Sequence, residues 1–159
     1  MIWQGGVMKK EAGSDRQLQI ARNFIEMIPH AAGLGMRIEE ISSEGAQISL
    51  GWHEDFVGDS RTGVIHGGVI SALMDTCAGA AVLSHGGEGG ADVISTATID
   101  LRIDYMRAAT PGHRITARAS CYHMTRSIAF VRAWAMDEDG DHPVAAAVGA
   151  FTVERQERS

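Results

Sequence analysis

The feature that most constrains this chain is the stretch from Gly67 to Ser84, in which almost every residue is apolar or small. The stretch lacks proline, is rich in alanine and is longer than a typical strand, so it predicts a helix. A helix that is apolar or small on nearly all of its sides has to be buried on nearly all of them. The rest of the chain is therefore expected to wrap around this helix, whose one charged residue is Asp75.

The remainder of the chain predicts a short helix and an antiparallel sheet. Leu18, Ala21 and Ile25 recur at helical spacing within Ser14–His30, and Pro29 marks the expected end of that helix. Alternating residues predict strands over Met36–Ile41, Ala46–Trp52, Ile99–Tyr105, Ile115–Cys121, Phe130–Met136 and Val144–Val153, with Asp55–Gly63 as a loop. This order predicts an α+β fold in which a curved antiparallel sheet wraps around the long central helix.

The length of 159 residues suits a single domain. We expect an N-terminal extension with the short helix over residues 1–34, the main domain over residues 35–154 and a C-terminal tail over residues 155–159. Hydrophobic residues make up 45% of the chain, which is enough to bury a normal core and argues against intrinsic disorder.

Charge and apolar patterning argue against several kinds of partner. The formal net charge of −6 leaves no broad basic surface for nucleic acid. No window approaches the roughly 18 uninterrupted apolar residues of a membrane span, so no membrane partner is expected. The two cysteines, Cys77 and Cys121, are far apart and form no CxxC pattern, which fits a reducing compartment and predicts a cytoplasmic protein.

The run His66-Gly67-Gly68 lies where the loop becomes the long helix. The first amides of a helix have no acceptor within the helix and lie at the positive end of its dipole. Glycine here allows a ligand to approach the backbone, so such an amide is able to hold a carbonyl oxygen on which negative charge develops. The structural alternative is that the two glycines only permit a tight turn into a crowded helix.

Asp75 is the second candidate, because it lies in the middle of the same apolar helix. The residues three and four positions away are Ser71, Ala72, Ala78 and Gly79, so no cation on the helix neutralises it. Burying a lone carboxylate is costly, and such a group is a reasonable functional candidate. The alternative is a structural carboxylate satisfied by Ser71, by the neighbouring threonine at position 76 or by another chain.

Gly67 and Asp75 are too far apart to act together within one chain. Eight residues of helix correspond to about 12 Å at roughly 1.5 Å per residue. One small reacting carbonyl cannot touch both groups of a single chain, so a site that uses both has to be shared between two subunits. The spacing predicts a homodimer with the site at its interface.

The pattern GxxHGGxxxxLxD, from Gly63 to Asp75, together with the strand order, resembles the hotdog-fold acyl-CoA thioesterases of the PaaI-like and thioesterase-superfamily-member-2-like group. The resemblance covers roughly residues 35–153 and implies hydrolysis of an acyl-CoA thioester. It implies that the Gly67 amide polarises the thioester carbonyl and that His66 orients it. Asp75 would serve across the dimer interface as nucleophile or general base, and Thr98 would assist the attacking water.

Relatives in this group commonly carry Asn six residues before the histidine, where this chain has Ser60. Ser60 and Gly68 are the expected substrate contacts beside the catalytic residues. Arg107 and Arg126 are candidates to meet the phosphates of coenzyme A, with Arg61 as a further one, although ordinary solvated arginines are at least as good an interpretation.

Four apolar or aromatic residues are candidates to line an acyl pocket: Phe56, Tyr105, Met106 and Trp134. Packing in the core of the sheet is the stronger expectation for them. No metal site is expected, because the seven histidines show no HxxxH spacing and neither cysteine has a metal-type partner.

The leading hypothesis is an acyl-CoA thioesterase that needs no metal or redox cofactor and works as a homodimer, with a homotetramer as the expected assembly. Two alternatives remain open. One is a hotdog hydratase or dehydratase that acts on acyl thioesters, and the other is a non-catalytic module that binds acyl-CoA.

Overall fold

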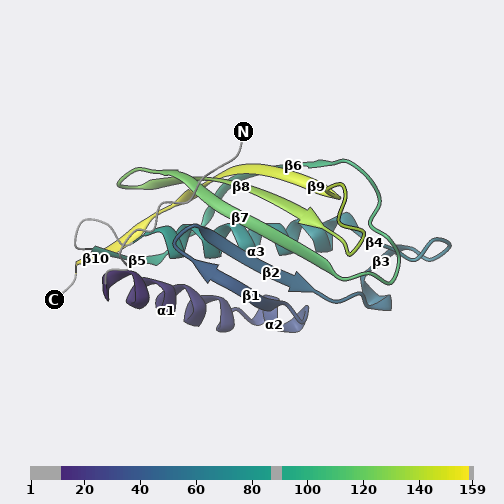
Figure 1. Ribbon diagram of the computed structural model, residues 1–159, viewed down its shortest axis with the longest axis horizontal. Helices are drawn as coiled ribbons and strands as arrows, with labels where there is room; N and C mark the ends of the chain where they lie inside the picture. Colours follow the sequence, from purple (N-terminus) through teal and green to yellow (C-terminus); the bar gives the residue numbers. More distant parts are fainter. Residues whose placement is uncertain (1–11, 87–90, 158–159) are drawn as a thin grey trace.

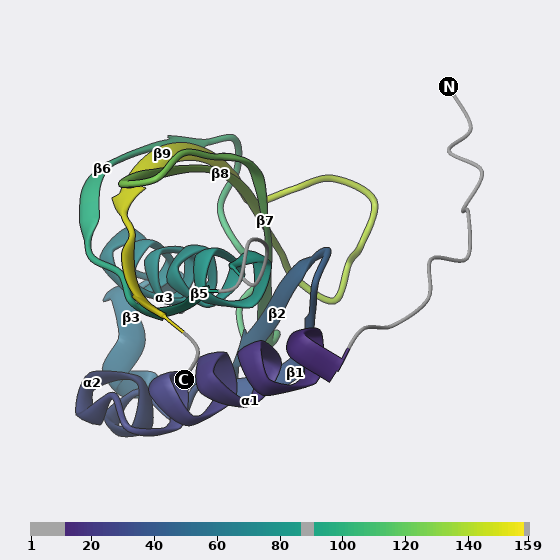
Figure 2. The ribbon, with the colours of Figure 1, turned by 90° about the vertical axis from the view of Figure 1, so that its left-hand side faces the viewer.

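The computed structural model describes residues 12–86 and 91–157. The apolar stretch forms helix α3 (Gly67–His85), and its buried side chains include Leu73, Met74 and Cys77, which are all 0% exposed. A six-stranded antiparallel sheet curls around this helix, as Figure 2 shows in a view along its length. The predicted α+β arrangement of a curved sheet around one central helix is therefore confirmed.

The large sheet does not follow the order of the sequence (Figure 1). Its strands, from one edge to the other, are β1 (Arg37–Ser42), β2 (Gly45–Leu50), β7 (Ile115–Met124), β8 (Ile128–Met136), β9 (Ala145–Thr152) and β6 (Thr98–Tyr105). All neighbouring pairs are antiparallel. The first strand of this sheet to follow α3 in the sequence, β6, lies at an outer edge and pairs only with β9 among the described residues.

The predicted N-terminal helix is two helices, α1 (Ala12–Glu26) and α2 (Pro29–Gly33). Pro29 begins α2 instead of ending α1, because proline is well tolerated in the first turn of a helix, where its missing N–H leaves no bond unmade. Helix α1 packs against α3, with Ala21 and Ile25 buried. The buried Gln17 side chain donates to the Leu83 and Val93 carbonyls and accepts from the Val93 amide, which ties α1 to the end of α3.

Five short elements were not predicted. The segment between β2 and α3, most of which was expected to be a loop, contains the one-turn helix η1 (Glu54–Phe56) and the hairpin of β3 (Val57–Asp59) and β4 (Val64–Ile65). Two further strands, β5 (Ala91–Ser95) and β10 (Glu154–Glu157), pair with each other, and β10 occupies most of the expected C-terminal tail. These strands are too short, or too polar, to show an alternating pattern in the sequence.

The two faces of the sheet have opposite side-chain sizes. The side chains of β8 that face α3 are small or β-branched: Ala129, Val131, Ala133 and Ala135. Trp134 points to the other side and is 41% exposed, so the expectation that it packs in the core is wrong. Small residues line the inner face because a curved sheet approaches an enclosed helix closely, which leaves the larger rings outside.

By length and composition, helix α3 is long and apolar enough to cross a membrane. The sequence-based statement that no window approaches a membrane span is therefore too strong. Most of its length is buried inside the fold. Enclosure by the sheet, visible in Figure 2, accounts for its hydropathy.

Candidate active site

The N-terminus of α3 presents one backbone amide to a ligand. His66 precedes the helix as its N-cap, and its Nδ1 atom accepts a hydrogen bond of 2.9 Å from the Gly68 amide. Gly67 is the first helical residue, and no hydrogen-bond acceptor for its amide exists within residues 12–86 and 91–157. Of the two glycines, Gly67 is therefore the one whose N–H remains available at the positive end of the helix dipole.

The same geometry determines the role that His66 is able to play. Because Nδ1 accepts from the Gly68 amide, the proton of the neutral ring lies on Nε2, which makes that atom a donor. The ring is packed against Gly58 of β3, where an added Cβ would lie 3.0 Å from the His66 Cα. The short β3–β4 hairpin thus holds His66 in place, with the Phe56 carbonyl accepting from the His66 amide at 2.8 Å.

Tyr105, at the end of β6, lies directly on Gly67. Its hydroxyl donates to the Gly67 carbonyl at 2.7 Å, and a Cβ added to Gly67 would come within 3.3 Å of its ring. A hollow of about 310 Å³ opens beside them, with Ile65, Ile70 and Met106 among its lining residues. The sequence suggested Tyr105 only as a wall or core residue. Its contact with the helix terminus depends on the strand order and could not be predicted from spacing.

Asp75 meets a hydroxyl from the other end of β6. The Thr98 hydroxyl donates to Asp75 Oδ1 at 2.7 Å, and the carboxylate is only partly buried. The structural partners considered in the sequence are engaged elsewhere, because Ser71 donates to the Gly68 carbonyl and Thr76 to the Ala72 carbonyl. Asp75 therefore keeps its second carboxylate oxygen available for chemistry, in an accessible position at the edge of the sheet.

The two half-sites lie at opposite ends of one strand. Tyr105 ends β6 beside Gly67, and Thr98 begins β6 beside Asp75. Asp75 follows Gly67 by eight positions along the helix, which keeps the two about 12 Å apart within one chain. Each chain thus carries one amide site and one carboxylate site along its exposed β6 edge.

The guanidinium of Arg107 is hydrogen-bonded within the protein. Its guanidinium makes two bonds of 2.7 Å to Asp137, and its other N–H groups donate to the carbonyls of His142 and Ala108. Asp137 is buried, and the Arg107 guanidinium holds the pKa of its carboxyl well below the usual range. All five donors of Arg107 are thus used to join two loops, although Arg107 also lines the hollow beside Gly67. A contact between Arg107 and substrate stays a prediction.

The remaining candidates lie on the surface. Ser60 is exposed in the β3–β4 turn, where Arg61 pairs with Asp59 and lowers the pKa of that carboxyl. Arg126 is exposed in the β7–β8 turn, at the end of the sheet where β6 begins and Thr98 lies. Arg126 is thus near the carboxylate end of β6 rather than the Gly67 end.

Neither a metal nor a thiolate is evident in the described part of the chain. No group of three or more His, Cys, Asp or Glu side chains within residues 12–86 and 91–157 lies close enough to hold a metal ion. Burial raises the pKa of the Cys77 thiol to about 12, so Cys77 is a protonated core side chain.

Sequence comparison gives the family. The thioesterase superfamily profile matches residues 62–144, which include the start of α3, Asp75 and Thr98. The medium/long-chain acyl-CoA thioesterase YigI of Escherichia coli K12 is 30% identical over 122 residues, which cover 71% of this chain and 78% of YigI. The Salmonella typhimurium YigI is 28% identical over 129 residues, covering 76% of this chain and 83% of that protein.

Solved structures give the fold. A Pseudomonas aeruginosa protein superimposes with a TM-score of 0.73 at 34% identity and covers 86% of this chain and 98% of its own. The Escherichia coli PaaI protein, from the phenylacetic acid degradation operon, superimposes with a TM-score of 0.77 at 19% identity, covering 93% of this chain and all of its own. With an open amide at the start of the enclosed helix and an acid in its middle, the chain belongs to the thioesterase superfamily and is a PaaI-like thioester hydrolase of the hotdog fold.

Proposed function

We propose that this protein hydrolyses acyl-CoA thioesters to the free acid and coenzyme A. The observation that carries the proposal is the pair of half-sites on α3, an unpaired Gly67 amide at its N-terminus and an Asp75 carboxylate held by Thr98. The curated relatives are named as medium/long-chain acyl-CoA thioesterases, which supports fatty acyl-CoA as the substrate class.

The two half-sites divide the chemistry between them. The Gly67 N–H would donate to the thioester oxygen and stabilise the charge that develops there, with His66 Nε2–H as a nearby donor that orients the carbonyl. As a general base, Asp75 would take a proton from the water whose oxygen attacks the carbonyl carbon. As a nucleophile, it would attack that carbon itself and form an anhydride that water then opens. In both routes the carbon–sulfur bond breaks and coenzyme A leaves as a thiolate that takes up a proton.

A two-fold homodimer through the β6 edges would bring complementary half-sites together. The outer edge of β6 has no partner strand among the described residues, and it carries the exposed apolar side chains of Ile99, Tyr105 and Met106. If two such strands pair side by side in antiparallel directions, the start of one lies opposite the end of the other. Thr98 of one subunit would then lie opposite Tyr105 of the partner subunit. Asp75 of one chain would then face the Gly67 amide of the other, which overcomes the separation within one chain.

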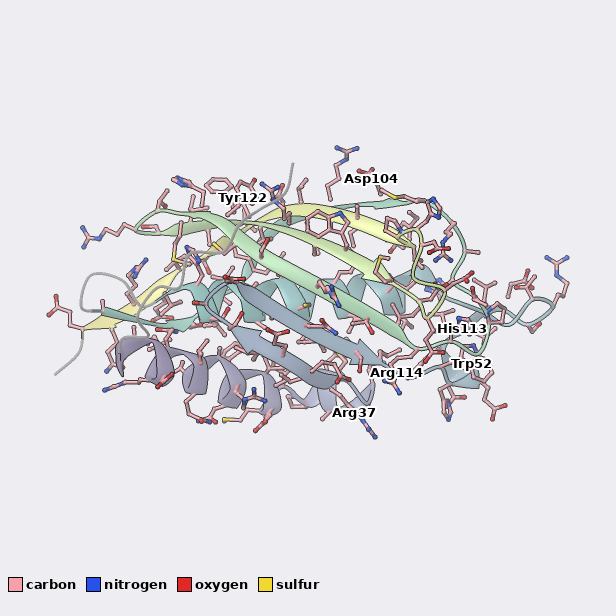
Figure 3. The ribbon with its side chains drawn as sticks, viewed as in Figure 1. Arg37, Trp52, Asp104, His113, Arg114 and Tyr122 are labelled. Atoms are coloured by element: carbon pink, nitrogen blue, oxygen red, sulfur yellow. The ribbon has the colours of Figure 1, made fainter. Side chains whose placement is uncertain are left out.

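A homotetramer would form by contact between the outer faces of two such sheets. Tyr122 and Trp134 are 50% and 41% exposed on that face, and Val148 lies beside them. Figure 3 shows Tyr122 and Asp104 on the outer side of the sheet, away from α3. Apolar groups gathered on the solvent side of a sheet are typical of an interaction surface.

The remaining substrate contacts follow from position. Ser60 and Gly68 would contact the acyl-CoA substrate on the Gly67 side, and Arg126 would meet coenzyme A phosphates from the end of the sheet where Thr98 lies. The reaction proposed here needs no metal or redox cofactor, because a helix amide polarises the carbonyl. A substrate carried on coenzyme A and two unpaired cysteines fit a cytoplasmic enzyme that acts away from membranes and nucleic acid.

A panel of acyl-CoA substrates, monitored for release of free thiol, tests this function. We expect wild-type protein to release thiol. Asp75→Asn should lose turnover by roughly two or more orders of magnitude while it keeps its oligomeric state. Asp141→Asn, an exposed acid in the loop between β8 and β9, is the matched control and should keep normal turnover.

The other outcomes identify the alternatives. Hydration of an enoyl-CoA without thiol release would indicate a hotdog hydratase, and tight binding without turnover a non-catalytic module. Near-normal thiol release by Asp75→Asn would remove Asp75 from the mechanism.

A further inference from the structure

The orientation of Thr98 does not follow from the regular alternation of its strand. Leu101 and Ile103 of β6 are partly buried on the α3 side, and Tyr105 on the same side reaches Gly67. Arg102 and Asp104 face outward. In a strictly alternating strand, Thr98 would share the outward face of these even-numbered residues. Its hydroxyl instead donates to Asp75 on the inner side.

A β-bulge at the start of β6 causes this change of face. Thr98 lies opposite Phe151 of β9, but Asp100 lies opposite Ala150, so β6 uses one extra residue, Ile99, at this point. A single inserted residue shifts every following side chain to the other face. The bulge therefore allows one strand to direct Thr98 toward Asp75 and Tyr105 toward Gly67.

Two features specific to this position hold the bulge. The Asp100 carboxylate accepts the Ala150 amide at 2.9 Å, so a side-chain oxygen takes the place of a strand carbonyl in the ladder. On β9, Gly149 leaves space for the displaced backbone, because a Cβ there would lie 2.5 Å from the Asp100 carbonyl oxygen. Asp100 itself is exposed and touches neither Asp75 nor Thr98 by any hydrogen bond in the described chain.

We propose that Asp100 is a positioning residue for the catalytic carboxylate. Its side chain fixes the bulge, the bulge turns Thr98 inward, and Thr98 holds one oxygen of Asp75 so that the other oxygen points to the reacting group. The expected effect of Asp100 on kcat rests on the proposed thioesterase function, whereas its effect on the Thr98–Asp75 hydrogen bond does not.

The test compares Asp100→Ala with Asp100→Asn. The alanine variant should lower kcat for acyl-CoA hydrolysis about tenfold with KM within about twofold, because the Thr98–Asp75 contact acts in the chemical step. Asp100→Asn keeps an oxygen that can accept from Ala150 and should retain most of kcat. Asp141→Asn, an exposed acid outside β6, is the control and should leave kcat unchanged.

A double-variant comparison separates positioning from general loss of stability. Asp100→Ala combined with Thr98→Ala should be no slower than Thr98→Ala alone, because both changes remove the same contact. If the loss of kcat in the double variant equals the product of the losses in the two single variants, the proposal is overturned. Gly149→Ala disturbs the same bulge from β9, so it should reproduce the kcat loss and gives a second test if Asp100→Ala does not fold.

Crystal structures of the variants provide the readout that is independent of activity. In Asp100→Ala we expect the distance from Thr98 Oγ1 to Asp75 Oδ1 to open beyond hydrogen-bonding range, whereas Asp141→Asn should keep it near 2.7 Å. An Asp100→Ala protein that keeps both this contact and its kcat would refute the positioning role. If wild-type protein releases no thiol but the contact opens as expected, the proposed function fails and the positioning role stands.

Discussion

His66, Gly67 and Gly68, at the start of α3, differ in whether their polar groups are already hydrogen-bonded within the protein. The Gly68 amide is bonded to His66, whereas the Gly67 amide has no acceptor in the described chain. The sequence motif suggested both glycines as contacts for substrate, and the cap geometry distinguishes between them. The proposed contribution of Gly67 is a single backbone N–H, so only a substitution that removes this N–H tests it.

Gly67→Pro removes this N–H with little disturbance. Gly67 is the first residue of the helix, where proline is tolerated, and His66 already has the extended conformation (φ −62°, ψ 134°) that precedes proline. We expect kcat for acyl-CoA hydrolysis to fall about 100-fold or more, as for loss of an oxyanion donor. Gly67→Ala keeps the N–H, adds a Cβ at the same place and should lose much less. Equal losses in the two variants would show that space, not the N–H, matters.

The strands of this fold were predictable where they alternate and not where they are short or irregular. The sheet strands from β6 to β9 follow from apolar periodicity, because the inner and outer faces differ in solvent exposure. The short β5 and β10 strands and the bulge at Ile99 were missed, because each depends on pairing with a strand distant in sequence. The ion pair of Arg107 was missed for the same reason, since its partner Asp137 is 30 residues away in the sequence.

The Arg107–Asp137 pair joins the loops that follow β6 and β8, and its effect should depend on pH. Arg107 lowers the pKa of Asp137 from its ordinary 3.8, so the folded state binds that proton less readily than the unfolded state. The pair therefore stabilises the fold above about pH 4 and ceases to do so as the pH falls through the lowered pKa.

Asp137→Asn should lower the free energy of unfolding at pH 7 by about 3 kcal/mol, because it leaves Arg107 without its charge partner. The variant should also lose less stability than wild type between about pH 4 and pH 2, since it lacks the proton-binding group. Urea unfolding across this range measures both effects. Asp141→Asn, an exposed acid in the same loop, is the control. If Asp137→Asn loses as much unfolding free energy at low pH as wild type does, the acid sensitivity comes from other carboxylates.

On the scale of the whole molecule, the proposed enzyme is incomplete as a single chain. The amide and the carboxylate lie on one helix, about 12 Å apart, and each lies beside one end of β6, whose outer edge has no partner strand among the described residues. A two-fold axis at that edge would form two equivalent sites, each with one group from either subunit. Dimerisation would then be part of the catalytic mechanism and not only a source of stability.

Subunit complementation tests this arrangement. Gly67→Pro and Asp75→Asn proteins should each be nearly inactive alone. After equal amounts are mixed and allowed to exchange subunits, half of the dimers would be mixed and each would contain one intact site of two, so activity should return to about a quarter of wild type. Thiol release before and after exchange measures the recovery. A mixture that stays inactive although mixed dimers form would show that each site belongs to one chain.

The sequence by itself determined the enclosed helix, the α+β class and the two residues of α3 that are proposed to carry the chemistry. These follow from local composition, because burial acts on each side chain according to its polarity. The tertiary structure alone decided that Thr98 faces Asp75, that Tyr105 lies on Gly67 and that Arg107 is occupied by Asp137. Such contacts depend on strand order and on a single inserted residue in β6, and pairing between distant segments leaves no periodic signal in the sequence.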